Sequence, residues 1–143
     1  MKLVHNHQTW KGVFTYNDGY DEADQYIDID FKLELIFTDK SFIGISVDSE
    51  SQGIFDKPAE VKGFVDDEKI SFILIYPCYY YKDDNGQIVL DRESRHPDIY
   101  YLGFWENEKN WVRGTWEMKI YEEKDGDDYI VELATGEFEM RRV

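Results

Sequence analysis

Strict alternation of apolar and charged residues in one segment constrains the fold more than any other feature of the sequence. In residues 27–35, Ile-Asp-Ile-Asp-Phe-Lys-Leu-Glu-Leu, every odd position is apolar and every even position is charged. Successive side chains of a β-strand point to opposite faces, whereas a helix would spread these apolar residues around its circumference. The segment therefore predicts an antiparallel strand with one buried and one solvent-facing side.

Similar runs with a two-residue period recur along the chain and predict further strands. They occupy residues 9–16, 41–48, 60–65, 69–76, 87–90, 99–105, 110–121, 129–133 and 137–142. No segment shows the period and caps of a long amphipathic helix. The sequence therefore predicts an all-β fold, a single antiparallel meander β-barrel of about eight to ten strands with little helix.

Turn residues separate these runs. Asn17-Asp18-Gly19, Asp84-Asn85-Gly86 and Asp125-Gly126 supply the positive φ angles that tight hairpins need. Residues 19–25 are compatible with one acidic helical turn, and residues 91–98 are predicted to form an irregular connection. The 143 residues fit one domain, 1–143, because a second core would have too few residues to close around. Residues 1–8 are expected to fray at the N-terminus.

A local pattern inside the strands sharpens the prediction of a barrel. Glycine stands two positions after an apolar residue in five predicted strands, at Gly12, Gly44, Gly63, Gly103 and Gly114. Glycine weakens a flat strand, so its repeated use indicates bends, bulges or the close approach of a large neighbour. Small closed barrels need such curvature, and a sandwich with chance glycines is the alternative.

The order of these residues resembles a known family pattern. The motifs, with the intervening residues left open, are Phe42-x-Gly44-x-x-x-Asp48, Gly53, Val61-x-Gly63, Ile70-x-Phe72, Tyr101-x-Gly103 and Val112-x-Gly114-x-Trp116. From Thr9 to Arg142 the chain resembles calycin-type barrels, in particular small lipocalin-like or avidin-like proteins of bacteria, most of them of unassigned function. This resemblance implies a small ligand held in the barrel mouth. The lipocalin Gly-x-Trp motif is absent, since Trp10 precedes Gly12, and the polar biotin contacts of avidins have no match, so no particular ligand follows.

The charge of the chain restricts its partners. Lys and Arg number 16 against 31 Asp and Glu, a formal net charge of -15. This surface repels nucleic-acid phosphates and anionic membranes, and it would attract a basic protein or a cationic ligand. The start of the chain has no apolar stretch of signal-peptide length, and Cys78 is the single cysteine. We therefore expect a cytoplasmic protein with no nucleic-acid or membrane partner; the sequence leaves its oligomeric state open.

Aromatic residues are the most distinctive chemistry, at 17% of the chain. Tyrosine and tryptophan combine a large apolar body with one polar group, so a cavity lined by them can both stack on a ligand and orient it. A core filled by aromatics is the alternative. The candidate ligand-binding residues are Trp10, Tyr16, Tyr76, Tyr80, Tyr101, Trp105, Trp116 and Arg113.

Other reactive groups give weaker patterns. His5 and His7 would share one face of a strand, but zinc or copper needs a third ligand that the nearby sequence does not offer. His96 is expected to be a solvated loop histidine whose protonated form Asp98 favours. The carboxylates that a barrel could pair for hydrolysis are predicted to face solvent: Asp28, Asp30, Glu34, Glu117 and Glu132. No metal, cofactor or catalytic residue is predicted.

Three functions remain open at this point. The first is a non-enzymatic barrel that binds a small apolar or aromatic ligand in an aromatic-lined cavity. The second is an acidic protein-binding module, similar to an immunity protein or an inhibitor, that captures a basic partner. The third is a hydrolase or isomerase in the barrel mouth, which requires a buried carboxylate or histidine with a shifted pKa.

Overall fold

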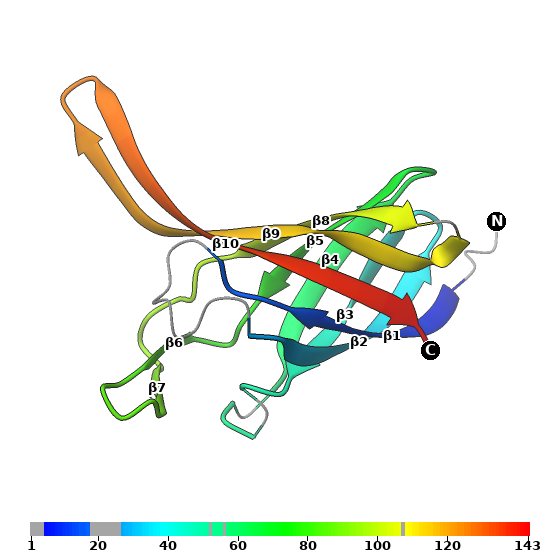
Figure 1. The fold of residues 1–143 in the computed structure, drawn as a ribbon, viewed down its shortest axis with the longest axis horizontal. Helices are drawn as coiled ribbons and strands as arrows, with labels where there is room; N and C mark the ends of the chain where they lie inside the picture. The colour runs from blue at the N-terminus through cyan, green and yellow to red at the C-terminus, as the bar shows by residue number, and fades with distance from the viewer. Residues whose placement is uncertain (1–4, 18–26, 52, 56, 107) are drawn as a thin grey trace.

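The fold is seen in a computed structural model, which describes residues 5–17, 27–51, 53–55, 57–106 and 108–143. Ten strands follow one another along the described chain (Figure 1). They are β1 (His5–Phe14), β2 (Ile29–Thr38), β3 (Ser41–Asp48), β4 (Ala59–Val65), β5 (Lys69–Ile75), β6 (Tyr79–Lys82), β7 (Ile88–Asp91), β8 (Ile99–Glu106), β9 (Glu108–Asp125) and β10 (Asp128–Arg142).

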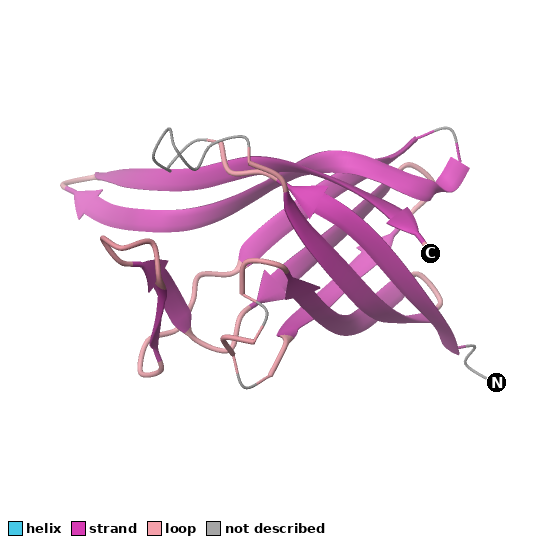
Figure 2. Cartoon of the chain, turned by 60° about the horizontal axis from the view of Figure 1, so that its bottom comes forward, coloured by secondary structure: helices cyan, strands magenta, loops and turns pink. Residues whose placement is uncertain are grey.

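Eight of these strands close into an antiparallel barrel in the order β1-β10-β9-β8-β5-β4-β3-β2. β6 and β7 form a separate two-stranded hairpin between β5 and β8, set apart from the barrel wall (Figure 2). The prediction of an all-β meander barrel is confirmed. No helix of a length and hydropathy suited to crossing a membrane occurs among the residues that the structure describes.

The two ends of the barrel differ. The start of β1 and the C-terminus lie at one end, and the β6–β7 hairpin lies beyond the other (Figure 1). At that second end, which we call the distal end, β1 ends at Phe14, β3 at Asp48 and β5 at Ile75. β1 begins at His5 and pairs with β2 from there. Residues 5–8 thus belong to the barrel wall, and residues 1–4 lie outside the described part; the expected fraying stays a prediction.

β9 and β10 are the longest strands and extend beyond the barrel as a hairpin (Figure 1). β8 pairs with β9 only as far as Met118, beyond which β9 and β10 pair with each other. The prediction of two strands at 129–133 and 137–142 is wrong. One strand, β10, runs through both segments, since Ala134 and Gly136 between them pair with Met118 and Trp116 of β9. The alternation of apolar and polar residues is interrupted there by a register shift between Glu132 and Leu133.

Lack of room for a Cβ atom explains the glycines within the strands. Gly63 faces the interior, where a Cβ atom would lie 2.6 Å from both Phe42 Cζ and Phe72 Cβ. At Gly103 a Cβ atom would lie 2.9 Å from Phe138 Cζ. The predicted close approach of a large neighbour is therefore confirmed at Gly63 and Gly103, whereas at Gly114 a Cβ atom would meet only backbone atoms of β8.

Two of the predicted hairpin turns occur as expected. Gly86, between β6 and β7, has a φ of 77°, and Gly126, between β9 and β10, has a φ of 63°. These angles suit glycine because it has no Cβ atom. The predicted helical turn at 19–25 lies outside the described residues, as do Asp18 and Gly19 of the first predicted turn.

Candidate functional site

Polar residues on the inner face of β3 form the centre of the candidate site. Phe42 is buried in the core, and Ser46 and Asp48 share its face, with exposed fractions of only 5% and 4%. β3 ends at Asp48, which places this carboxylate inside the distal end of the barrel. A buried carboxylate is costly unless hydrogen bonds or opposite charges compensate it, so its partners decide what the site can do.

Hydrogen bonds hold both oxygens of Asp48. The Tyr76 hydroxyl donates to Oδ2 at 2.5 Å, and the backbone N–H of Ser51 donates to Oδ1 at 2.7 Å. No ion pair joins Asp48 to a lysine, arginine or histidine within the described residues. Ser46 takes no part in these two bonds.

Burial determines the protonation state of Tyr76. Removal from water raises the pKa of its hydroxyl well above 10.0, and the neighbouring Tyr80 and Asp48 raise it further. Tyr76 therefore stays protonated at neutral pH and acts as a hydrogen-bond donor. Asp48 is thus a hydrogen-bond acceptor whose carboxylate is held in position by the Tyr76 hydroxyl.

Aromatic rings surround this pair. The ring centroid of Tyr76 lies 5.5 Å from that of Phe55, in a stacked arrangement, and 5.2 Å from that of Tyr80. The His96 imidazole stacks on Tyr80 with a centroid distance of 5.0 Å and an interplanar angle of 16°. Residues from the β3–β4 loop, β6 and the β7–β8 loop thus meet at the end of β5. We call Ser46, Asp48, Tyr76, Tyr80 and His96 the distal site.

His96 differs from the sequence prediction. The side chain is buried, with 4% exposed, and burial lowers its pKa. Its Nδ1 lies 2.8 Å from the Pro97 carbonyl oxygen, a contact that a neutral ring with hydrogen on Nδ1 makes as donor. Asp98 instead accepts a hydrogen bond from Arg95. The prediction of a solvated histidine is therefore wrong. Asp98 does raise the pKa of His96, as expected, but burial of the ring outweighs this effect and the net pKa is lowered.

Five of the eight predicted ligand-binding residues lie toward this end or in the middle of the interior. Tyr76 and Tyr80 belong to the distal site. The Tyr16 ring contacts Trp116 edge to face at 5.9 Å, and the Tyr16 hydroxyl donates to Glu50 at 2.6 Å. Tyr101 stacks on a core phenylalanine of β5 and lies 6.5 Å from Trp116. These three residues line the interior next to the distal site.

The other three predicted residues lie elsewhere. Trp10 and Trp105 pack against each other, with centroids 6.1 Å apart, near the end that carries the termini. Arg113 is exposed on the outer face of β9, where it forms an ion pair with Glu139 at 3.7 Å and lies over the Trp111 ring. It does not contact the interior, because Val112 and Gly114 on either side of it face inward. Arg113 therefore belongs to the outer surface.

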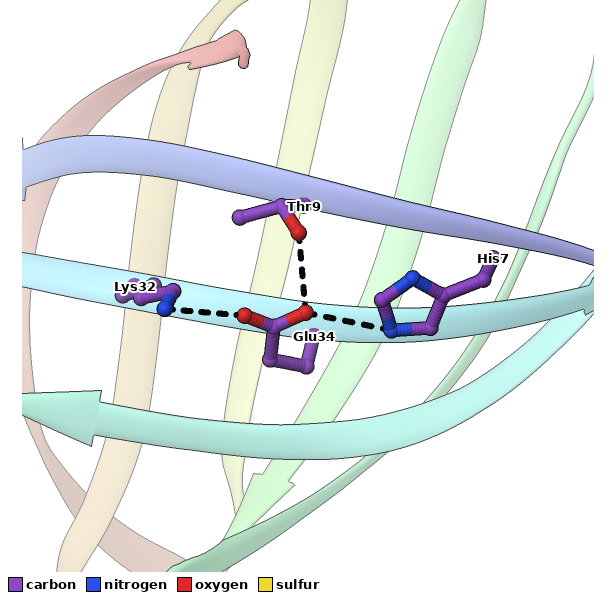
Figure 3. A network of polar contacts seen from close by, with 4 residues as sticks. All are labelled: His7, Thr9, Lys32 and Glu34. Atoms are coloured by element: carbon purple, nitrogen blue, oxygen red, sulfur yellow. Dashed lines mark hydrogen bonds and ion pairs between the residues drawn. The ribbon is translucent and has the colours of Figure 1, made fainter.

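The outer face also carries a separate polar network on β1 and β2. Glu34 accepts a hydrogen bond from Thr9 at 2.8 Å and forms ion pairs with Lys32 and His7 (Figure 3). These contacts lower the pKa of the Glu34 carboxyl. No group of three side chains suited to hold a metal ion occurs among the described residues. His7 thus has a carboxylate partner on the surface, and Glu34 is a convenient comparison for Asp48.

Sequence reasoning missed Ser46, Asp48 and His96. A signal for Asp48 existed, since it lies four residues after Gly44 and six after Phe42 and so shares their face of the strand. No local signal could have placed His96 beside Tyr80, because the contact depends on how a long connection folds back on the barrel.

Comparisons with known proteins agree with this architecture. No protein-family model and no curated protein sequence matches the chain. Among solved structures, the rhizavidin–biotin complex aligns over 96% of this chain and 92% of its own, with 11% identity and a TM-score of 0.52. Rhizavidin alone (13% identity, 91% and 81% of the two chains, TM-score 0.44) and a short afifavidin–biotin complex (14%, 91% and 87%, TM-score 0.43) also align. The first alignment, together with the closed barrel of eight strands, shows that the chain has the avidin-like, calycin-type fold that its sequence resembles.

Proposed function

We propose that this barrel binds a small molecule at the distal site and holds it without chemical change. One observation carries the proposal: a buried carboxylate, Asp48, meets a tyrosine donor and a ring of aromatic side chains but has no cationic partner among the described residues. Binding sites commonly combine apolar walls with a few fixed polar groups, and this combination is what the distal site offers.

The polar groups indicate which ligands fit. Each carboxylate oxygen can accept more than one hydrogen bond, so Asp48 retains acceptor capacity beyond Tyr76 and Ser51. The Ser46 hydroxyl can donate or accept. A ligand with N–H groups or a positive charge and a flat body would use both Asp48 and the rings of Tyr76 and Tyr80. The net charge of -15 favours the approach of such a cation.

Fold similarity suggests the first compound to test. Rhizavidin, whose barrel aligns with this one, is known in a complex with biotin. Biotin is therefore the first probe, followed by aromatic amines, amidines, vitamins and haem. Because a ligand at one hundred times its Kd stabilises the folded state by about 2.7 kcal/mol, a thermal-shift screen would detect even moderate binding.

The experiment compares two acid-to-amide variants in this screen. Asp48→Asn removes the carboxylate of the distal site, and Glu34→Gln removes a carboxylate of the outer network. We expect at least one compound to raise the Tm of the wild type and of Glu34→Gln, with a clearly smaller shift in Asp48→Asn. A hit that shifts all three proteins equally would place binding elsewhere.

The other two functions stay predictions. Capture of a basic protein partner rests on the acidic surface alone. A reaction in the barrel mouth would use the buried Asp48 and His96, and no contact between these two side chains favours it over binding.

A further inference from the structure

A row of outward side chains crosses four neighbouring strands of the barrel wall, β2, β1, β10 and β9. Lys11 of β1 pairs with Lys32 of β2 on one side and with Arg141 of β10 on the other. Arg141 in turn pairs with Trp111 of β9. We call these four residues the outer basic row. All of them point outward, because each stands next to an interior residue that is at most 1% exposed: Trp10, Leu33, Met140 or Val112.

Three consecutive positions of this row carry a positive charge, although the net charge of the chain is -15. Side chains opposite each other on neighbouring strands have Cβ atoms about 5 Å apart, and like charges there destabilise the sheet. Glu34 forms an ion pair with Lys32 at 2.9 Å and so compensates one of the three charges (Figure 3). Lys11 and Arg141 have no ion-pair partner in the described part of the chain. The fold therefore places two uncompensated cations side by side.

The indole of Trp111 adds a hydrogen-bond donor without an acceptor. Its Nε1 atom is buried and makes no hydrogen bond to any residue that the structure describes. The guanidinium of Arg141 lies over the same ring, with Cζ 4.3 Å from the ring centroid. A buried donor without an acceptor is unfavourable, and an indole N–H can only donate. An oxygen atom of a ligand held by the exposed Arg141 side chain would supply the missing acceptor.

We infer that Lys11, Arg141 and Trp111 bind a compact tetrahedral oxyanion, the phosphate or sulfate group of a small molecule. The ammonium of Lys11, the guanidinium of Arg141 and the indole N–H of Trp111 come from three adjacent strands. A guanidinium offers two parallel N–H donors that match two oxygens of one phosphate group. Donors from three strands suit an anion whose oxygens point in several directions better than they suit a planar carboxylate.

Acidic residues around the row limit the size of the ligand. Asp30 and Glu34 are the outward residues of β2 on either side of the row. Glu139 is the next outward residue of β10 and forms an ion pair with Arg113 at 3.7 Å. These carboxylates repel a polyanion that extends beyond the row, such as a nucleic acid, whereas a single anionic group meets the two cations. The row lies on the outer wall and does not include the distal site, so the inference does not depend on the proposed function.

NMR of the full chain labelled with ¹⁵N tests the inference through the Trp111 indole. Inorganic phosphate and inorganic sulfate are titrated at about pH 8, where phosphate is mainly a dianion like sulfate, with chloride keeping the ionic strength constant. The indole signal of Trp111 is identified by its loss in Trp111→Phe. We expect this signal to move until the site is saturated, while those of the other three of the four tryptophans stay in place. The anion with the lower Kd identifies which of the two groups the ligand carries.

Substitutions of the two cations test their role in binding. Lys11→Gln and Arg141→Gln should each raise the Kd of the anion by about tenfold, since each removes a charge-assisted hydrogen bond. Lys62→Gln is the matched control, because Lys62 is exposed on β4, outside the row. Lys62 also lacks an ion-pair partner among the residues described, and its removal should leave Kd unchanged. Circular dichroism of each variant reports whether it folds.

Three results would overturn the inference. The first is a Trp111 signal that neither phosphate nor sulfate moves. The second is a Kd that Lys11→Gln and Arg141→Gln leave unchanged, or that Lys62→Gln raises equally. The third is a short DNA duplex that moves the same signal at a lower concentration than either inorganic anion, since the site would then select a polyanion.

Discussion

Replacing Tyr76 with phenylalanine isolates the interaction on which the distal site depends. The substitution keeps the ring that packs against Phe55 and Tyr80 and removes only the hydroxyl that donates to Asp48 at 2.5 Å. A buried hydrogen bond to a charged group contributes about 1.5–3 kcal/mol. We therefore expect the free energy of unfolding to fall by about 2 kcal/mol and the Tm by about 8 °C.

Urea unfolding, followed by tryptophan fluorescence at one protein concentration, measures this loss. The midpoint should fall without a change in slope, since the surface exposed on unfolding stays the same. Tyr81→Phe is the control, because that tyrosine is exposed on the β6–β7 hairpin, and its effect should stay within about 0.5 kcal/mol.

A double-mutant cycle with Asp48→Asn shows whether the loss comes from this pair. In the Asp48→Asn background the hydroxyl faces a neutral amide, so Tyr76→Phe should cost about 1 kcal/mol less than in the wild type. An equal cost in both backgrounds would refute the reasoning, since the hydroxyl would then stabilise the fold through something other than the carboxylate.

Three further predictions concern the interior and pH. Gly63→Ala should lower the free energy of unfolding by about 1–3 kcal/mol in the same urea assay, because its Cβ would lie 2.6 Å from Phe42 and Phe72 atoms; an unchanged midpoint would contradict the packing. Burial raises the pKa of Tyr76, so the unfolded chain releases this proton first and stability should fall as pH rises above about 10; Tyr76→Phe should show less of this loss across an alkaline pH series. Burial lowers the pKa of His96, so the unfolded chain binds a proton more readily below about pH 6.5 and stability should fall as pH decreases from there; His96→Gln should flatten this slope, and an NMR titration showing a normal imidazole pKa would contradict it.

β2 shows where sequence reasoning succeeds. Its alternation places apolar residues at odd positions and charges at even ones, and the structure buries the odd positions Ile29, Phe31, Leu33 and Leu35. One face is plainly apolar and the other plainly charged, so the burial of apolar side chains decides which face points into the barrel. Gly63 and Gly103 were equally informative, since each lies where an interior phenylalanine ring needs room.

β3 shows where it fails. Alternation alone would bury Ile43, Ile45 and Val47 and expose Ser46 and Asp48, whereas the structure does the reverse. Phe42 decides which face of β3 points inward, because its ring packs in the core with its centroid 4.8 Å from that of Phe37 on β2. The inversion places polar groups inside the barrel and aliphatic groups outside, and the proposed ligand site uses the inner face. Departures from local patterning are expected where a protein has a function to perform.

The contact between His96 and Tyr80 lay beyond sequence reasoning for another reason, although Tyr80 itself was predicted as a site residue. Both belong to the connection between β5 and β8, and their position depends on how the β6–β7 hairpin folds against the distal end. Tyr80 packs against the core, while Tyr79 and Tyr81 on either side of it are exposed, as expected for alternate side chains of a strand. Alternation gives two sets but does not say which set meets the barrel.

Calorimetric titration of the strongest compound from the screen tests the central claim most directly, that the distal site binds a small ligand through Asp48. The measurement compares Kd for the wild type, Asp48→Asn and Glu34→Gln. If the ligand binds at the distal site, Kd for Asp48→Asn should be at least about tenfold higher than for the wild type, since a charge-assisted hydrogen bond is lost. Kd for Glu34→Gln should equal that of the wild type. Equal affinity of all three proteins would contradict the account.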